Sequence, residues 1–476
     1  MAIDEPVVSV GGGRIRGRTS GGVTRFLGIP YAAPVVGPAR FRLPEPVAPW
    51  SGIRDASEHG PAAPQLPYPR QVQSLLGVPE RQADDCLNLS VWTPDPSGAG
   101  LPVMVWIHGG AFTRGANSYP LYDGTAFARD GVVLVSINYR LGMPGFAVLP
   151  DAPHNRGLHD QLFALRWVRE NIAAFGGDPD NVTVFGESAG AISVACLLAA
   201  ESAHGLFHRA ILQSGNASAV ATTADSARVT AAAAQLLGVR AGAAEFGALP
   251  SERLLAAQAE VGANLAADPD PARWGASVIS GGSAIMSMFP VIDGDLVSGV
   301  PLDVLAAAPG RCVPLLVGTN AEEFRLFAVP MGLAGAIDAQ TLPLLLDRAG
   351  IGPGVLAKYR HSEAKPGDLY CEILTDRFFR EPARLLAAAV DTCYRYEFTW
   401  PTEVLQLGSC HALELPFVFD TLAVSHQLTG DHPPQHLADE IHSAWVSFAT
   451  DGDPGWPVRE ADAPVLRSFG TSVVSH

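Results

Sequence analysis

The chain has 476 residues, of which 47% are hydrophobic and 17% charged, and its formal net charge is −16 at pH 7. This balance predicts a large buried core and argues against global disorder. The acidic charge, with no run of Lys and Arg, argues against a nucleic-acid partner, because phosphate contacts need clustered cations.

The N-terminal residues show no targeting segment. Met1–Val10 contains two acidic residues and no cation, whereas a signal peptide begins with a basic region followed by an apolar one. The longest apolar runs stay far below the ~18 residues that cross a membrane. We therefore expect a cytoplasmic protein without a membrane span. The Ala- and Gly-rich composition favours a bacterial source.

Strand and helix patterns alternate in the first half of the chain. Apolar, strand-like runs are separated by a helical pattern that ends at a Gly pair and is followed by a turn pattern. Strands that are apolar on both faces and separated by helices predict a parallel sheet covered on both sides. In chain order these segments are strands Val103–Ile107 and Val132–Tyr139, helix Asp160–Phe175, turn Asp178–Asn181 and strand Val182–Phe185.

A short loop after the first of these strands has the composition of an oxyanion site. His108-Gly109-Gly110-Ala111-Phe112 follows Val103–Ile107 directly. Such a loop can direct backbone N–H groups at a developing oxyanion, together with the N–H of the residue after a nucleophile. The alternative is a plain Gly-rich turn.

The segment Gly186-Glu187-Ser188-Ala189-Gly190 matches G-x-S-x-G. The pattern alone is weak, and a capping serine would explain it equally well. Its context adds weight, because a buried strand precedes Ser188 and an Ala-rich helix follows, as in a nucleophile elbow. Together with the upstream Gly-rich loop, it predicts a serine nucleophile with an oxyanion site.

A serine nucleophile needs a base, and the base needs an orienting acid later in the chain. Residues 222–268 read as helical, and the next apolar strand, Val313–Val317, is followed by Glu322 and Glu323. Residues just beyond a strand lie at the carboxyl edge of the sheet. Sequence physics alone leaves both glutamates open as the acid.

Six histidines follow these acids. His411 lies in a loop that enters an apolar run, which favours it as the base, whereas the others lie in polar or terminal stretches and are expected to be solvated. Those others are His426, His432, His436, His442 and His476.

The cysteines do not predict a structural framework. In a chain this long, six cysteines without a CxxC pair indicate neither disulfides nor a zinc site. We expect buried free thiols and no metal or other cofactor. The cysteines are Cys86, Cys196, Cys312, Cys371, Cys393 and Cys410.

Along nearly its whole length the sequence resembles the type-B carboxylesterase family, which includes para-nitrobenzyl esterases and cholinesterases. The resemblance implies an α/β-hydrolase fold: a central, mostly parallel sheet with helices on both faces and helical insertions over an active-site gorge. It implies one domain over 1–476, with insertions at about 222–290 and 325–390. The motifs are Phe26–Ala32, Arg40–Arg42, Asp85–Leu89, Pro102–Phe112, Asn138–Gly142, Phe175–Pro179, Gly186–Gly190, Gln213–Gly215, Pro290–Gly294 and Gly408–Phe419.

The resemblance also implies roles for single residues. Ser188 matches the nucleophile and His411 the base, and the family spacing from Gly318 selects Glu323 over Glu322 as the acid. The oxyanion donors are the backbone N–H groups of Gly110, Ala111 and Ala189. Ser214 and Glu414 match positions that support the histidine from behind, although loop capping explains them equally well. Glu187 matches a gorge glutamate that favours imidazolium; the alternative is an elbow residue that makes a local hydrogen bond.

The departures from the family bear on substrate choice. No Trp lies between Trp50 and Trp92, so a choline-binding Trp is missing. No cysteine precedes Cys86, so the first family disulfide cannot form. Ala284 and Met286 stand where cholinesterases narrow the acyl pocket with aromatic residues, which predicts a wider pocket.

We therefore predict a serine ester hydrolase that forms an acyl-enzyme on small to medium neutral hydrophobic or aryl esters. The alternative is a catalytically silent binding protein on the same fold, but such proteins lack the serine. A metallohydrolase is disfavoured, because no H-E-x-x-H segment occurs.

Overall fold

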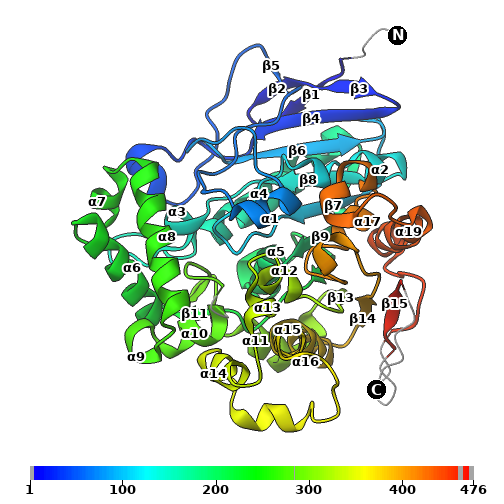
Figure 1. The fold of residues 1–476 in the computed structure, drawn as a ribbon. Coiled ribbons are helices and arrows are strands. Elements are labelled where there is room, and N and C mark those ends of the chain that lie inside the picture. Colours follow the sequence, from blue (N-terminus) through cyan, green and yellow to red (C-terminus); the bar gives the residue numbers. More distant parts are fainter. Residues whose placement is uncertain (1–4, 283–284, 459–464, 471–476) are drawn as a thin grey trace.

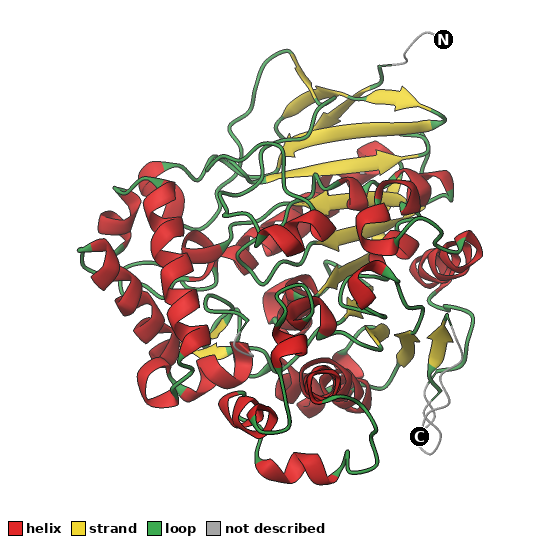
Figure 2. Ribbon diagram, viewed as in Figure 1, coloured by secondary structure: helices red, strands yellow, loops and turns green. Residues whose placement is uncertain are grey.

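A ten-stranded sheet forms the centre of the computed structural model, which describes residues 5–282, 285–458 and 465–470. Figure 2 shows its strands as a twisted stack with helices on both sides. In spatial order the strands are β15 (Arg467–Phe469), β14 (Cys393–Phe398), β13 (Leu315–Asn320), β10 (Arg209–Gln213), β9 (Gly177–Glu187), β7 (Leu101–Ile107), β8 (Val133–Ile137), β6 (Asn88–Thr93), β4 (Val23–Pro30) and β3 (Arg18–Ser20).

The strands from β8 to β15 run parallel, whereas β6, β4 and β3 add at one edge as antiparallel strands. The predicted mostly parallel sheet is therefore confirmed. A smaller sheet combines β1 (Val7–Val10), β2 (Gly13–Arg16) and β5 (Ile53–Asp55), and β11 (Ala221–Thr222) pairs with β12 (Val291–Ile292).

Both faces of the central sheet are buried, as the apolar strands predict. In β7, Val103 and Val105 pack into one hydrophobic cluster and Met104 and Trp106 into another. The first cluster lies under α4 (Arg156–Asn171) and α5 (Ala189–Ala199), and the second under α17 (Leu415–Val418) and α19 (Gln435–Asp451). Alternate side chains of one strand therefore stabilise two separate layers of helix.

The predicted turn at Asp178–Asn181 is wrong as an element boundary, because these residues lie within β9. The pairing of β9 with β7 shifts from Gly177–Leu101 to Val182–Val103, so the extra residues form an irregularity inside the strand. Asp178 still makes the turn-like hydrogen bond that Asp residues favour, because its carboxylate accepts the N–H of Asp180, two residues later, at 2.8 Å.

Two helical segments interrupt the alternation of strands and helices. In Figure 1 the first gathers on the left of the molecule, and the second extends from the centre of the view to the bottom. The first contains α6 (Thr223–Leu237), α7 (Ala243–Gly247), α8 (Ser251–Ala267), α9 (Pro271–Trp274) and α10 (Ala276–Gly282). The second contains α12 (Arg325–Ala328), α13 (Leu333–Ala336), α14 (Thr341–Arg348), α15 (Pro366–Thr375), the π-helical turn η7 (Asp376–Arg380) and α16 (Glu381–Ala389).

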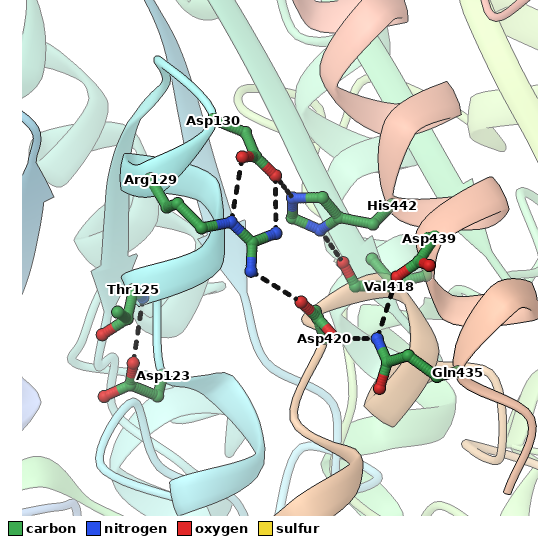
Figure 3. Close-up of polar contacts among 9 residues, drawn as sticks. All are labelled: Asp123, Thr125, Arg129, Asp130, Val418, Asp420, Gln435, Asp439 and His442. Atoms are coloured by element: carbon green, nitrogen blue, oxygen red, sulfur yellow. Dashed lines mark hydrogen bonds and ion pairs between the residues drawn. The ribbon is translucent and has the colours of Figure 1, made fainter.

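A polar network ties α17 to its neighbours (Figure 3). From α19, His442 donates a ring N–H to the carbonyl oxygen of Val418 at 2.7 Å, and its Nε2 lies 3.2 Å from Asp130. Arg129, at the end of α2 (Thr125–Arg129), pairs with Asp420 at 2.9 Å. These contacts fix α17, which begins just after the loop that carries His411.

The expectation that His442 is solvated is therefore wrong. Its side chain faces inward from α19 and packs against Phe127, with ring centroids 4.5 Å apart. Polar residues surround it in the sequence, but the helix turns them outward and the histidine inward. His426, His432 and His436 are exposed as expected, and His476 lies outside the described residues.

None of the six cysteines, which all lie within the described residues, forms a disulfide, and all but Cys312 are buried. Within the described ranges, no helix combines the length and apolar character needed to traverse a bilayer.

Candidate functional site

A cavity of about 290 Å³ lies where β9 and β13 end. Most of its lining is apolar or aromatic. It brings together most of the residues singled out in the sequence, although they come from distant parts of the chain. Those that line it are Gly110, Ala111, Glu187, Ser188, Ser214, Met286 and His411.

Ser188 occupies a strained turn between β9 and α5. Its φ of 56° and ψ of −122° lie where a residue with a side chain rarely settles. A Cβ on Gly186 would come within 2.6 Å of the Gly190 backbone, and one on Gly190 within 2.0 Å of the Ile107 carbonyl oxygen. The two glycines are therefore required for the turn that exposes Ser188 to the cavity.

The Gly-rich loop after β7 presents free backbone donors beside Ser188. Gly110 and Ala111 both have positive φ, 108° and 54°. Within the described residues, the N–H groups of Gly110, Ala111 and Ala189 donate to no protein acceptor. A Cβ on Gly109 would lie 2.6 Å from the Glu187 carboxylate, so only glycine lets the loop approach the serine so closely.

Gln65 holds this loop, a role that the sequence analysis did not predict. Its side-chain amide donates to the Gly115 carbonyl oxygen at 2.8 Å and accepts the Gly115 N–H at 2.9 Å. Gln65 is buried and lies in a Pro-rich segment. The only feature of the sequence that could have indicated this role is a Gln within a Pro-rich segment, and that feature does not indicate which residue the Gln contacts.

His411 is bound on one side by Glu323. Its Nδ1 lies 2.6 Å from Glu323 Oε2, and the other carboxylate oxygen accepts the N–H of Asn320 at 2.8 Å. Glu323 is fully buried and His411 is 4% exposed. A buried carboxylate at Nδ1 fixes the ring orientation and leaves Nε2 facing the cavity.

Glu322 points elsewhere. Its side chain is 43% exposed, and its carboxylate accepts the N–H of Ser409 at 2.9 Å. It therefore helps to position the loop before His411 but does not touch the ring. Of the two adjacent glutamates, only Glu323 contacts the histidine.

The second ring nitrogen of His411 meets Glu187. Nε2 lies 2.9 Å from Glu187 Oε1, and among the described contacts no hydrogen bond joins the ring to Ser188. Burial alone would lower the pKa of His411, but the carboxylates of Glu187 and Glu323 outweigh it and hold that pKa well above its usual value. The free site therefore favours an imidazolium between two carboxylates.

Glu414 lies behind this pair. It is fully buried and accepts hydrogen bonds from Asn320 at 2.6 Å and from Gln213 at 3.0 Å. Burial, with Glu187 and Glu323 nearby, raises the pKa of Glu414 to about 8. It is therefore mainly protonated at neutral pH. Ser214 lines the cavity with a buried hydroxyl that has no partner among the described residues, so its support of His411 stays a prediction.

Large side chains form the rest of the pocket. Met286 lines the cavity, whereas Ala284 lies outside the described residues. The rings of Phe327 and Phe379 pack against the His411 imidazole, with centroids 5.1 and 5.0 Å away. Phe379 comes from the π-helical turn η7, which no simple periodicity in the sequence indicates.

Comparisons with known proteins agree with this geometry. A model described as "Carboxylesterase family" matches residues 4–465. The chain is 38% identical over 472 residues to para-nitrobenzyl esterase from Bacillus subtilis (strain 168), covering 95% of this chain and 92% of that protein. It is 34% identical over 490 residues to cocaine esterase from Homo sapiens, covering 94% and 83% respectively.

Solved structures lead to the same conclusion. A carboxylesterase from Geobacillus stearothermophilus superposes with a TM-score of 0.83 at 36% identity, covering 98% of this chain and 96% of that one. A PNB esterase structure gives a TM-score of 0.85 at 36% identity, with the same coverage. The chain therefore belongs to the carboxylesterase family and is an ester-hydrolysing enzyme with the α/β-hydrolase fold.

Proposed function

We propose that this esterase works through an acyl-enzyme, with Ser188 as nucleophile, His411 as base and Glu323 as the orienting acid. The observation that carries the proposal is the strained Ser188 in one cavity with a histidine whose Nδ1 is held 2.6 Å from a buried carboxylate. A silent binding protein would have no use for this strain or for unpaired N–H groups beside the serine.

In acylation, neutral His411 takes the Ser188 proton while Oγ attacks the ester carbonyl. The N–H groups of Gly110, Ala111 and Ala189 bind the resulting oxyanion. His411 then gives its proton to the departing alcohol, and the acyl group stays on Ser188. Deacylation repeats these steps with water as nucleophile and releases the carboxylic acid.

Glu187 has a positioning role in this proposal. It binds the protonated ring at 2.9 Å in the free site. When His411 loses that proton, the attraction to Glu187 falls and Nε2 is released to serve Ser188. Glu414 is mainly protonated and therefore stabilises the floor of the site without adding another negative charge.

The substrates that we propose are small to medium neutral esters with hydrophobic or aryl groups. The apolar side chains around the cavity, Met286, Phe327 and Phe379 among them, favour such groups. A cytoplasmic location fits six cysteines without a disulfide among the described residues, a pattern typical of a reducing compartment.

The pH dependence tests the two carboxylates around His411. Only the neutral ring can accept the serine proton, so kcat/KM should rise with pH through one ionisation. Because the pKa of His411 is raised, the midpoint should lie above the ordinary value of about 6.5. Glu187→Gln removes one of the charges that raise it, so the midpoint should move down. Initial rates of hydrolysis of a neutral ester at varied pH measure the midpoint in the wild type and in the variant. A midpoint that Glu187→Gln leaves unchanged would contradict the positioning role of Glu187.

The acyl pocket predicts a chain-length preference. A flexible Met286 leaves room that an aromatic residue would fill, so p-nitrophenyl butyrate should give a higher kcat/KM than the acetate. Each buried methylene contributes about 0.8 kcal/mol, or roughly fourfold, until the pocket is full. Met286→Phe should move the preference back toward acetate. If the variant keeps the wild-type profile across acetate, butyrate and hexanoate, Met286 does not bound the acyl site.

A further inference from the structure

One side of the cavity is polar, in contrast to the rest of its lining. We call this side the polar wall, and it consists of Tyr68, Arg114, Tyr119 and Tyr122. The other ionisable groups on the described lining are Glu187 and His411, both assigned above to the reacting end. Arg114 is therefore a cation without a role in the proposed chemistry.

Arg114 is held in place by contacts with its neighbours but is not neutralised. Its Nε donates to the carbonyl oxygen of Leu66 at 3.2 Å, and its guanidinium lies over the Tyr68 ring, 5.0 Å from the centroid. No carboxylate among the described residues forms an ion pair with it. Stacking uses the flat face of the guanidinium and leaves its edge N–H groups available. One terminal nitrogen donates to the Thr113 hydroxyl at 3.3 Å, and the remaining terminal N–H groups have no acceptor among the described residues. The guanidinium can therefore bind an anion, and no described carboxylate of the protein occupies that position.

The backbone of Arg114 links this cation to the reaction site. Its N–H donates to the Gly110 carbonyl oxygen at 2.9 Å and closes the turn that presents the Gly110 and Ala111 donors. Arg114 and two of the three proposed oxyanion donors, Gly110 and Ala111, therefore belong to one short loop. A substrate bound both by Arg114 and by these donors would have its ester carbonyl held at a fixed distance from the guanidinium.

The three tyrosines add donors to the same wall. Within the described residues, none of the hydroxyls of Tyr68, Tyr119 and Tyr122 has a hydrogen-bond partner. The rings of Tyr119 and Tyr122 stack with centroids 5.8 Å apart. Burial raises the pKa of Tyr68 to about 12 and raises those of Tyr119 and Tyr122 as well. All three hydroxyls therefore remain donors at neutral pH.

The reacting end of the cavity repels anions. Two carboxylates, Glu187 and Glu323, surround one His411 ring, so even the protonated ring leaves a net negative charge there. A substrate carboxylate beside the scissile carbonyl would meet this charge. An anion bound at Arg114 must therefore lie at a part of the substrate remote from the ester bond.

From these observations we infer that the polar wall is a subsite for a carboxylate carried by the ester substrate, several atoms from the scissile bond. The substrates would be half-esters of dicarboxylic acids, or esters of hydroxy acids. This inference rests on the proposed chemistry at Ser188 and extends its substrates beyond neutral esters. A guanidinium edge and phenol hydroxyls that line the same cavity are donors suited to a carboxylate.

The test compares esters that differ only in charge. Monomethyl adipate and methyl 5-carbamoylpentanoate present a carboxylate or a carboxamide of the same shape on the acyl side. The butanoate esters of 4-hydroxybutanoate and of 4-hydroxybutanamide present the same two groups on the alcohol side. We expect the wild type to show a higher kcat/KM for the carboxylate in at least one pair. Arg114→Gln should lower that ratio about tenfold, and Tyr119→Phe by about twofold to fivefold.

Arg70→Gln is the matched control, because it makes the same change in net charge at an exposed residue that does not line the cavity. It should keep the wild-type ratio. The inference is overturned if neither carboxylate is preferred, or if Arg114→Gln lowers both members of a pair equally, since that would be a purely structural effect on the loop. Hydrolysis of the carboxamide esters, and its loss in Ser188→Ala, tests the proposed chemistry separately.

Discussion

Replacing Ser188 with alanine is expected to abolish ester hydrolysis, with a loss of about a million-fold in kcat, the scale seen when a triad serine is removed. Without Oγ there is no group to form the acyl-enzyme, and the oxyanion donors alone support only slow attack by water. The protein should remain folded, because the Ser188 hydroxyl makes no hydrogen bond within the described residues. Turnover of p-nitrophenyl butyrate and the thermal midpoint measure the two effects.

Ser214→Ala is the matched control for this experiment. Ser214 has a φ of 55°, close to the 56° of Ser188, and its hydroxyl also lines the cavity without a partner. Its replacement should cost far less activity than that of Ser188. If Ser188→Ala kept more than about a tenth of wild-type kcat, the nucleophile assignment would be wrong.

The second large effect is expected from Glu323→Gln. The carboxylate accepts the His411 N–H and the Asn320 N–H with separate oxygens, at 2.6 and 2.8 Å. A glutamine can replace only one of these acceptors, because its other group is an NH₂ donor. It also carries no charge to stabilise the imidazolium. We expect kcat to fall by about ten-thousand-fold, as for the comparable change in a serine protease.

Glu322→Gln provides the comparison within the same segment. The side chain is exposed, and the amide oxygen can still accept the Ser409 N–H that the carboxylate accepts at 2.9 Å. Its kcat should stay near the wild-type value. The reverse order of effects, with Glu322 essential and Glu323 dispensable, would refute the assignment of the acid.

The fold and the strained turn that carries Ser188, the proposed nucleophile, could be predicted because their signals are local. The apolar strands β7, β8 and β9, and the glycines that flank Ser188, appear as continuous patterns in the sequence. Local patterns could not distinguish Glu322 from Glu323 as the orienting acid, because both residues lie just after β13. Family spacing favours Glu323, and the structure gives the physical reason: the end of β13 directs one side chain into the interior and the other to the surface.

The contacts between distant segments could not be predicted. Gln65 meets Gly115 across 50 residues, and the π-helical turn that brings Phe379 to His411 has no simple periodicity. The pairing of His411 with Glu187 depends on the strained turn at Ser188, which determines where the neighbouring side chain points. Sequence patterns give the elements, whereas these contacts depend on how the elements pack.

Covalent labelling tests the central claim most directly. An aryl organophosphate should react with the serine that His411 activates, releasing one equivalent of leaving group and inactivating the enzyme in the same proportion. Peptide mass spectrometry should then place the phosphoryl adduct on Ser188. Complete inactivation with the adduct on any other residue would contradict the account.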